Sequence, residues 1–213
     1  MKQSKKKSTP DLFIQFVLEN GKNPVSVFEF CKANDLIETD FYKEFPSIKA
    51  LEKKVLGDFF TYTSEMLSKN EAYQQYGPQE KLLSFYFTFF EVLTANRSYV
   101  LLALNSDKSA LKNLQKLSEL RTHFKDYAKS IFADNIASEI KNLEKVKSET
   151  FQEGAWVQLL VLMKFWMEDK STGFEKTDIF IEKAVKATFD LIENTPVQSL
   201  IDLGKFLYKE MKN

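Results

Sequence analysis

Histidine and cysteine often serve as catalytic bases, nucleophiles or metal ligands, and this chain of 213 residues has one of each, His123 and Cys31. A catalytic triad, a histidine-rich metal site or a His–Cys pair needs partners that the sequence lacks. Lys125 and Asp126 lie close to His123 in the sequence, which indicates a half-exposed position on a helix. We therefore predict no catalytic residue, no metal site and, with one cysteine, no internal disulfide.

Other motifs that could carry chemistry are also missing. The sequence contains neither of the glycine-rich motifs that cradle nucleotide phosphates. Glu175, Asp178 and Glu182 form an acidic group whose spacing places them on one solvated helix face, beside lysines. We therefore expect a protein that is not an enzyme and that uses no cofactor.

The composition narrows the class of protein further. Hydrophobic residues make up 44% of the chain, and thirty basic residues balance thirty acidic ones, which excludes a disordered chain and argues against non-specific coating of nucleic acid. The N-terminus lacks the apolar core of a signal peptide. The densest apolar stretch, 156–167, is interrupted by Gln158 and Lys164, whereas a membrane span needs roughly 20 apolar residues. We expect a cytoplasmic protein with no membrane span.

Helices are expected to position these residues. Apolar residues recur at three- and four-residue spacing, which predicts an all-α fold of nine or ten helices. Three short helices are expected at 10–20, 26–33 and 38–44. The first is expected to have Thr9 as its N-cap and Pro10 at its first helical position. Capping boxes mark further starts at Ser26, Thr150, Thr172 and Thr195. One stripe of apolar residues consists of Leu51, Val55, Phe59, Tyr62 and Met66. Further apolar stripes lie within residues 82–93, 157–168, 180–192 and 197–211.

Residues 26–51 contain a short helix, a tight turn and a second short helix, which is the pattern of a helix-turn-helix. Its most specific part is the run Phe41-Tyr42-x-x-Phe45-Pro46-Ser47, which leads into a helix containing Leu51. Further matching positions are Phe30, Cys31, Ala33 and Leu36. The segment resembles the TetR family of bacterial transcriptional regulators. The resemblance implies a DNA-binding head over residues 1–46 and a helical body over residues 47–213 for ligand binding and dimerisation.

In this family the second helix of the motif enters the major groove of operator DNA. The resemblance therefore implies that Thr39, Tyr42 and Lys43 contact DNA, with Lys49 and the basic N-terminal arm on phosphates.

The motif departs from the family pattern at three positions. Asp35 replaces the turn glycine, and it tolerates left-handed backbone. Ile37 replaces the capping serine, so Glu38 or Thr39 is expected to take over as the cap, and Ile48 replaces a phosphate-contacting lysine. The recognition helix also carries three acids, and residues 1–60 contain no arginine, which weakens the prediction of DNA binding.

The resemblance implies that the body binds an apolar small molecule. We assign Phe85, Tyr86 and Phe89, with Trp156, to a candidate pocket wall. An aromatic stripe at helical spacing also packs as ordinary core, and the sequence leaves both interpretations open. Polar candidates close by in the sequence are Thr88, Glu91, Asn96 and Arg97.

The family also implies a homodimer, in which the helices expected at 152–169 and 175–193 pair with their copies. The first of these is apolar on most sides, which favours burial on two faces. The expected interface residues are Val157, Leu160, Phe165, Phe180, Ala184 and Leu191.

Two functions follow from these observations. The first is a homodimeric, ligand-responsive transcriptional regulator that represses by binding operator DNA. The alternative is a TetR-fold binding protein for an apolar small molecule or lipid that has lost DNA binding, which the acidic recognition helix and Ile48 favour.

Overall fold

The computed structural model describes residues 7–132 and 141–194, which form helices and, within these ranges, no strand. The all-α prediction is confirmed. The helices are α1 (Thr9–Asn20), α2 (Val27–Ala33), α3 (Glu38–Glu44), α4 (Ile48–Ser68), α5 (Glu71–Gln75), α6 (Pro78–Ala95), α7 (Arg97–Asn105), α8 (Ala110–Lys116), α9 (Ser118–Phe132), α10 (Lys141–Glu168) and α11 (Glu175–Asn194). These exceed the nine or ten expected, because a helix as short as α5 shows no sequence period. None in the described ranges is long and apolar enough to cross a bilayer.

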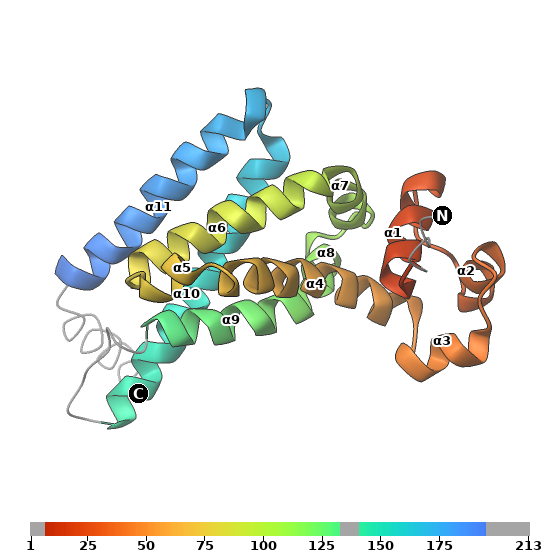
Figure 1. Cartoon of the computed structure of the whole chain (residues 1–213), viewed down its shortest axis with the longest axis horizontal. Helices are drawn as coiled ribbons and strands as arrows, with labels where there is room; N and C mark the ends of the chain where they lie inside the picture. Colours follow the sequence, from red (N-terminus) through yellow and green to blue (C-terminus); the bar gives the residue numbers. More distant parts are fainter. Residues whose placement is uncertain (1–6, 133–140, 195–213) are drawn as a thin grey trace, which may run out of the picture.

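The chain begins with a head of three short helices, α1 to α3, at the end of the molecule opposite to α11 (Figure 1). The cap of α1 is Ser8 rather than Thr9, so that prediction is wrong by one residue. The Ser8 hydroxyl accepts from the Asp11 N–H at 3.3 Å, and the Asp11 carboxylate accepts from the Ser8 N–H at 3.1 Å. This reciprocal pair satisfies two N–H groups that the helix leaves free.

The turn between α2 and α3 has the backbone of a helix-turn-helix. Ser26 caps α2 as predicted, because its hydroxyl accepts from the Glu29 N–H at 3.1 Å. Asp35 has φ of 52°, the left-handed conformation that the turn requires. Ile37 precedes α3 without any side-chain cap, and α3 begins at Glu38, so the expectation that Glu38 or Thr39 would act as the cap is wrong.

Helix α4 joins the head to the body, and α6 and α9 pack along it (Figure 1). The first three members of its predicted stripe are buried, but Tyr62 and Met66 are 57% and 43% exposed. Phe60 takes their place, since its ring packs on Phe85 of α6 and on His123 of α9. The second half of α4 therefore buries a different face from the one that its spacing predicted.

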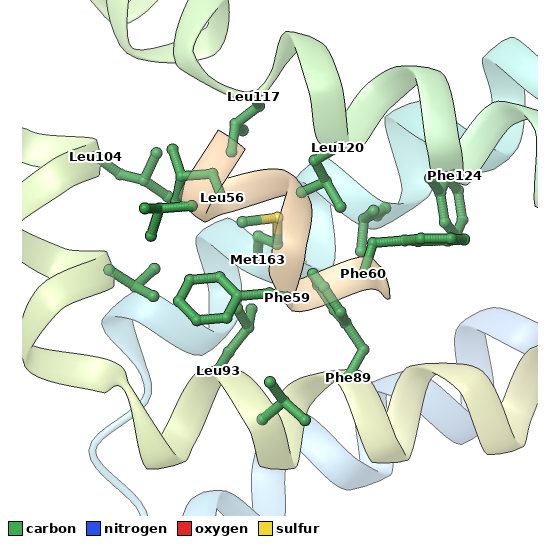
Figure 2. Close-up of a cluster of buried hydrophobic side chains, with 14 of the residues drawn as sticks. Leu56, Phe59, Phe60, Phe89, Leu93, Leu104, Leu117, Leu120, Phe124 and Met163 are labelled. Carbon is green, nitrogen blue, oxygen red and sulfur yellow. The ribbon is translucent and has the colours of Figure 1, made fainter. Parts of the chain in front are cut away.

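Between α4, α6, α9 and α10 lies a continuous core of aromatic and branched side chains (Figure 2). Phe89 and Leu93 of α6 face Phe59 of α4, and Met163 of α10 lies beside them. Phe124 of α9 is fully buried and belongs to the same core. Burying many rings together supplies most of the stabilisation of such a bundle, because each large side chain contributes roughly 1.5–3 kcal/mol on leaving water.

The two long helices α10 and α11 depart from prediction at their starts. Thr150 lies inside α10, which begins at Lys141, so the capping box at Thr150 starts no helix. No Gly or Pro interrupts the sequence between Lys141 and Glu153, so nothing ends the helix before Thr150. Thr172 lies in a single 3-10 turn (Thr172–Phe174) before α11 and does not cap that helix. The start expected at Thr195 and the stripe at 197–211 lie outside the described residues.

Candidate functional site

Helix α3, the expected recognition helix, exposes one face and buries the other. Phe41 is 3% exposed and packs edge-on against Phe30, which anchors α3 on α2. Thr39, Tyr42 and Lys43 lie on the exposed side, and Tyr42 is 53% exposed. The fold therefore gathers three of the four predicted DNA contacts on one exposed face of α3.

Charges on that face partly cancel. The Lys43 ammonium lies 2.7 Å from the Asp40 carboxylate, and the hydrogen bond from Lys43 together with the Asp40 charge raises the pKa of Lys43. Glu44 is exposed one residue further along. Lys49, the fourth predicted contact, is exposed on the first turn of α4, and its charge adds to the lysines that lower the pKa of Asp107 in the body.

The four residues predicted to line a ligand pocket all lie in the packed core. Phe85, Tyr86 and Phe89 have no exposed surface, and Trp156 is 6% exposed. The Phe85 and Phe89 rings stack at 5.5 Å between centroids. The described side chains around these residues thus pack as an aromatic core.

One polar connection crosses that core. The Tyr86 hydroxyl donates to Gln158 of α10 at 3.0 Å, and the Gln158 amide donates to Thr188 and to the Ala184 carbonyl of α11. Burial raises the pKa of Tyr86, so this hydroxyl stays protonated. The chain of hydrogen bonds fixes α10 and α11 to α6, and the sequence offered no periodic signal for Gln158 in this role.

An open groove of about 570 Å³, here called the junction groove, lies where α1, α4 and α6 meet. Its lining includes Glu91 and Asn96, two of the polar residues singled out from the sequence, but none of the four predicted pocket aromatics. Its apolar floor includes Tyr62 and Met66, the two stripe residues that α4 leaves exposed.

The residues expected at a dimer interface divide between surface and partly buried positions. Val157 and Phe165 of α10 are 55% and 37% exposed, with Val161 between them at 50%. Leu191 of α11 is 64% exposed. Leu160, Phe180 and Ala184 are half-buried and pack against the core, and the Phe180 ring contacts Phe165. Exposed apolar side chains therefore lie on both helices, and they are here called the apolar surface of α10 and α11.

The ends of α10 and α11 are held by two groups that the sequence did not single out for this role. The Arg97 guanidinium packs against the rings of Trp166 and Phe174, 4.4 and 4.5 Å from their centroids, and donates to two carbonyls at the end of α10. Asp169 accepts hydrogen bonds from the N–H and hydroxyl groups of Ser171 and Thr177. Burial alone would raise the pKa of Asp169, but these bonds outweigh it and lower the pKa from 3.8 to about 2.

A buried polar cluster joins head and body, and sequence patterns missed it. Glu52 of α4 accepts from Asn23 at 3.0 Å and lies 3.7 Å from the ammonium of Lys116. That ammonium also lies 3.0 Å from Asp107 and donates to the Ala103 carbonyl. The hydrogen bond from Lys116 is the largest cause that lowers the pKa of Asp107. No sequence motif pairs residues so far apart.

The single histidine lies where the sequence predicted, and the single cysteine is buried. His123 is half-exposed on α9, and its ring stacks on Phe60. Cys31 is 2% exposed in the head, and burial, followed by the charge of Glu38, raises the pKa of its thiol. Within the described residues no three histidine, cysteine or acidic side chains converge in a metal-binding arrangement.

Comparisons with known proteins now identify the fold. A family model described as tetracyclin repressor-like, C-terminal domain, matches residues 81–207, which is more than half of the chain. The chain belongs to the TetR family. Its fold is therefore that of the TetR transcriptional regulators, as the resemblance of the helix-turn-helix implied.

Two solved structures share this TetR fold. A putative TetR-family transcriptional regulator from Syntrophomonas wolfei is 15% identical, with a TM-score of 0.60, over 89% of this chain and 95% of that one. The fatty acid degradation regulator FadR from Bacillus halodurans is also 15% identical, with a TM-score of 0.50, over 88% of this chain and 96% of that one. At such identities the likeness establishes the fold alone. A search of curated proteins finds no match.

Proposed function

We propose that this TetR-family protein is a ligand-responsive repressor that binds operator DNA as a homodimer. In this proposal the head, residues 1–46, binds DNA, and the body, residues 47–213, binds the ligand and forms the dimer. The observation that carries the proposal is the exposed face of α3, where Thr39, Tyr42 and Lys43 lie at helical spacing.

The proposed homodimer uses the apolar surface of α10 and α11. Exposed valine and phenylalanine side chains at every fourth residue of α10 are poorly suited to water, and a two-fold axis would bury them against their copies. In a TetR dimer of this kind two recognition helices reach successive major grooves, about 34–36 Å apart. A ligand that changes this spacing would change operator affinity.

A second candidate function is a binding protein of the same fold that no longer binds DNA. The acids of α3 favour it, because Asp40 already neutralises Lys43 and Glu44 faces solvent beside it. Phe28 and Ile37 are 61% and 64% exposed on the head, where a DNA-binding surface uses polar and basic groups.

One titration separates the two functions. The full chain is added to labelled DNA from upstream of its own gene and to shuffled DNA of equal length, at about 0.05 M and 0.2 M salt. If the protein is a repressor, it should bind the upstream DNA more tightly than the shuffled DNA, and it should still bind at the higher salt concentration. Tyr42→Ala is expected to weaken it about tenfold, whereas Tyr76→Ala, a tyrosine exposed in the body, leaves it unchanged.

The opposite result supports the binding-protein function. In that case neither DNA is bound at the lower salt, and organic extraction of the purified protein releases an apolar molecule detectable by mass spectrometry.

A further inference from the structure

The junction groove combines an apolar floor with a strictly acidic set of charges. Its lining residues are Ser8, Pro10, Asp11, Ile14, Val55, Asp58, Phe59, Tyr62, Met66, Glu91, Val92, Ala95 and Asn96. Among the described residues three carboxylates line it, one from each of the three helices, and no lysine or arginine does. At about 570 Å³ the groove is within the size range of small-molecule sites.

The floor of the groove is unusually apolar for an exposed surface. Tyr62 and Met66 lie one turn apart on α4 and keep 57% and 43% of their surface in water. Phe59 lies beneath them at 7% exposure, and Ile14 reaches in from α1. An occupant with an aliphatic or aromatic body would take this surface out of water.

The carboxylates differ in how far other groups neutralise them. Asp11 accepts from Ser8 in the α1 cap, which leaves its negative charge in place. Asp58 pairs with Lys54, and the same ammonium also lies 3.9 Å from Glu119. Among the described residues Glu91 has no ion-pair partner.

The field around Glu91 is negative as well. Partial burial, followed by the charge of Glu91 and then of Glu182, raises the pKa of Asp178 on α11. These acids lie on the two helices α6 and α11, which pack against each other. A cation at the Glu91 end of the groove would therefore meet the carboxylate of Glu91 and the negative field of the acids on α11.

We propose that the junction groove binds an amphipathic organic cation, whose charged head lies at Glu91 and whose apolar body covers Phe59, Tyr62 and Met66. Aromatic faces next to carboxylates attract a quaternary or primary ammonium group through both the ring quadrupole and the opposite charge. An organic anion of the same shape would meet like charges at Asp11 and Glu91. The site thus selects a ligand by the sign of its charge as well as by its apolar area.

The inference goes beyond the proposed repressor function and does not depend on it, because binding is measured without DNA. The probe is 4-phenylbutyltrimethylammonium, compared with 5-phenylpentanoate, an anion of similar length and ring. Calorimetric titration of the full chain is expected to give binding of the cation at least tenfold tighter than binding of the anion.

Matched variants locate the charge. Glu91→Gln removes one carboxylate without changing the shape of the groove and is expected to weaken cation binding about fivefold. Tyr62→Ala, at an exposed position that leaves the core intact, is expected to weaken it by a similar factor. Glu65→Gln removes the same charge from an exposed residue of α4 outside the groove and is expected to leave the affinity unchanged.

Methyl resonances report where the probe binds, independently of affinity. With ¹³C-methyl methionine, the Met66 signal should move on adding the cation, while the signal of Met163, buried in the core, should not. Four outcomes overturn the proposal: no binding at millimolar cation, equal affinity for the anion, an unchanged affinity in Glu91→Gln, or a shift confined to Met163.

Discussion

The ammonium of Lys116 lies 3.7 Å from the carboxylate of Glu52, and both side chains are buried, at 8% and 3% exposure. Glu52 belongs to the second turn of α4, directly behind the head, and Lys116 ends α8 in the body. Asn23, from the loop between α1 and α2, donates to the same carboxylate. Head, connecting helix and body therefore meet at one pair of opposite charges.

Replacing Lys116 by methionine should destabilise the protein by about 3 kcal/mol, because it leaves Glu52 as a buried charge with a neutral partner only. Urea unfolding followed by circular dichroism measures the change. Lys112→Met, on the exposed face of the same helix, is the control and should cost less than about 0.5 kcal/mol. The double variant with Glu52→Gln should recover at least about 1 kcal/mol, and strict additivity would contradict a coupled pair.

Arg97 should not be replaceable by lysine. Its planar guanidinium packs against two rings and donates to two carbonyls, and an ammonium cannot keep this geometry. We expect Arg97→Lys to lose about 1–2 kcal/mol of stability by the same unfolding assay. Arg121→Lys is the matched control, since Arg121 forms a half-exposed pair with Glu153 and should lose less than about 0.5 kcal/mol. Equal losses at both arginines would contradict the stacking argument.

Asp169 should add stability that disappears in acid. Its pKa is about 2 in the folded protein, below the ordinary 3.8, so its contribution is present above about pH 4 and is lost as the pH falls toward 2. Asp169→Asn should cost about 1 kcal/mol at pH 7 and flatten the stability curve between those values. Thermal melts from pH 7 to 2.5 measure this, with Asp126→Asn on exposed α9 as the control that should keep the slope.

The sequence predicted the fold well because the signals for helices and turns are local in the sequence. Caps such as Ser26 and the left-handed turn at Asp35 depend on residues a few positions apart, so the helix-turn-helix could be recognised directly. The family match then confirmed the fold class.

The candidate sites were harder to predict because they depend on which helices cover which face. Tyr62 has the spacing of a core residue, yet α4 exposes it, since α6 and α9 pack on Phe60 instead. The Glu52–Lys116 pair joins positions 64 residues apart, and no periodicity reports such a contact. The pocket wall predicted around Phe85 remains a prediction, and Phe85 itself lies in packed core.

A charge placed on the apolar surface of α10 should separate the proposed dimer. Val161→Glu introduces a carboxylate at a position 50% exposed in one chain, and a two-fold axis brings two copies of it together. The dissociation constant should rise at least about a hundredfold, as measured by sedimentation. Leu111→Glu, at 66% exposure on α8, is the control and should leave the mass unchanged. A wild-type chain that sediments as a monomer at micromolar concentration would contradict the dimer itself.

Asp40 should restrain DNA binding by holding Lys43. Their 2.7 Å ion pair keeps the ammonium away from phosphates and adds a negative charge that repels them. Asp40→Asn should therefore raise the affinity for upstream DNA about threefold at low salt, whereas Lys43→Ala should lower it and reduce the salt slope by about one per head. Lys164→Ala removes a lysine that pairs with Glu168 on α10 in the same way, and it should change neither value. If Asp40→Asn leaves DNA affinity unchanged while the chain still binds its operator, α3 does not face the phosphates, and the head must use another surface.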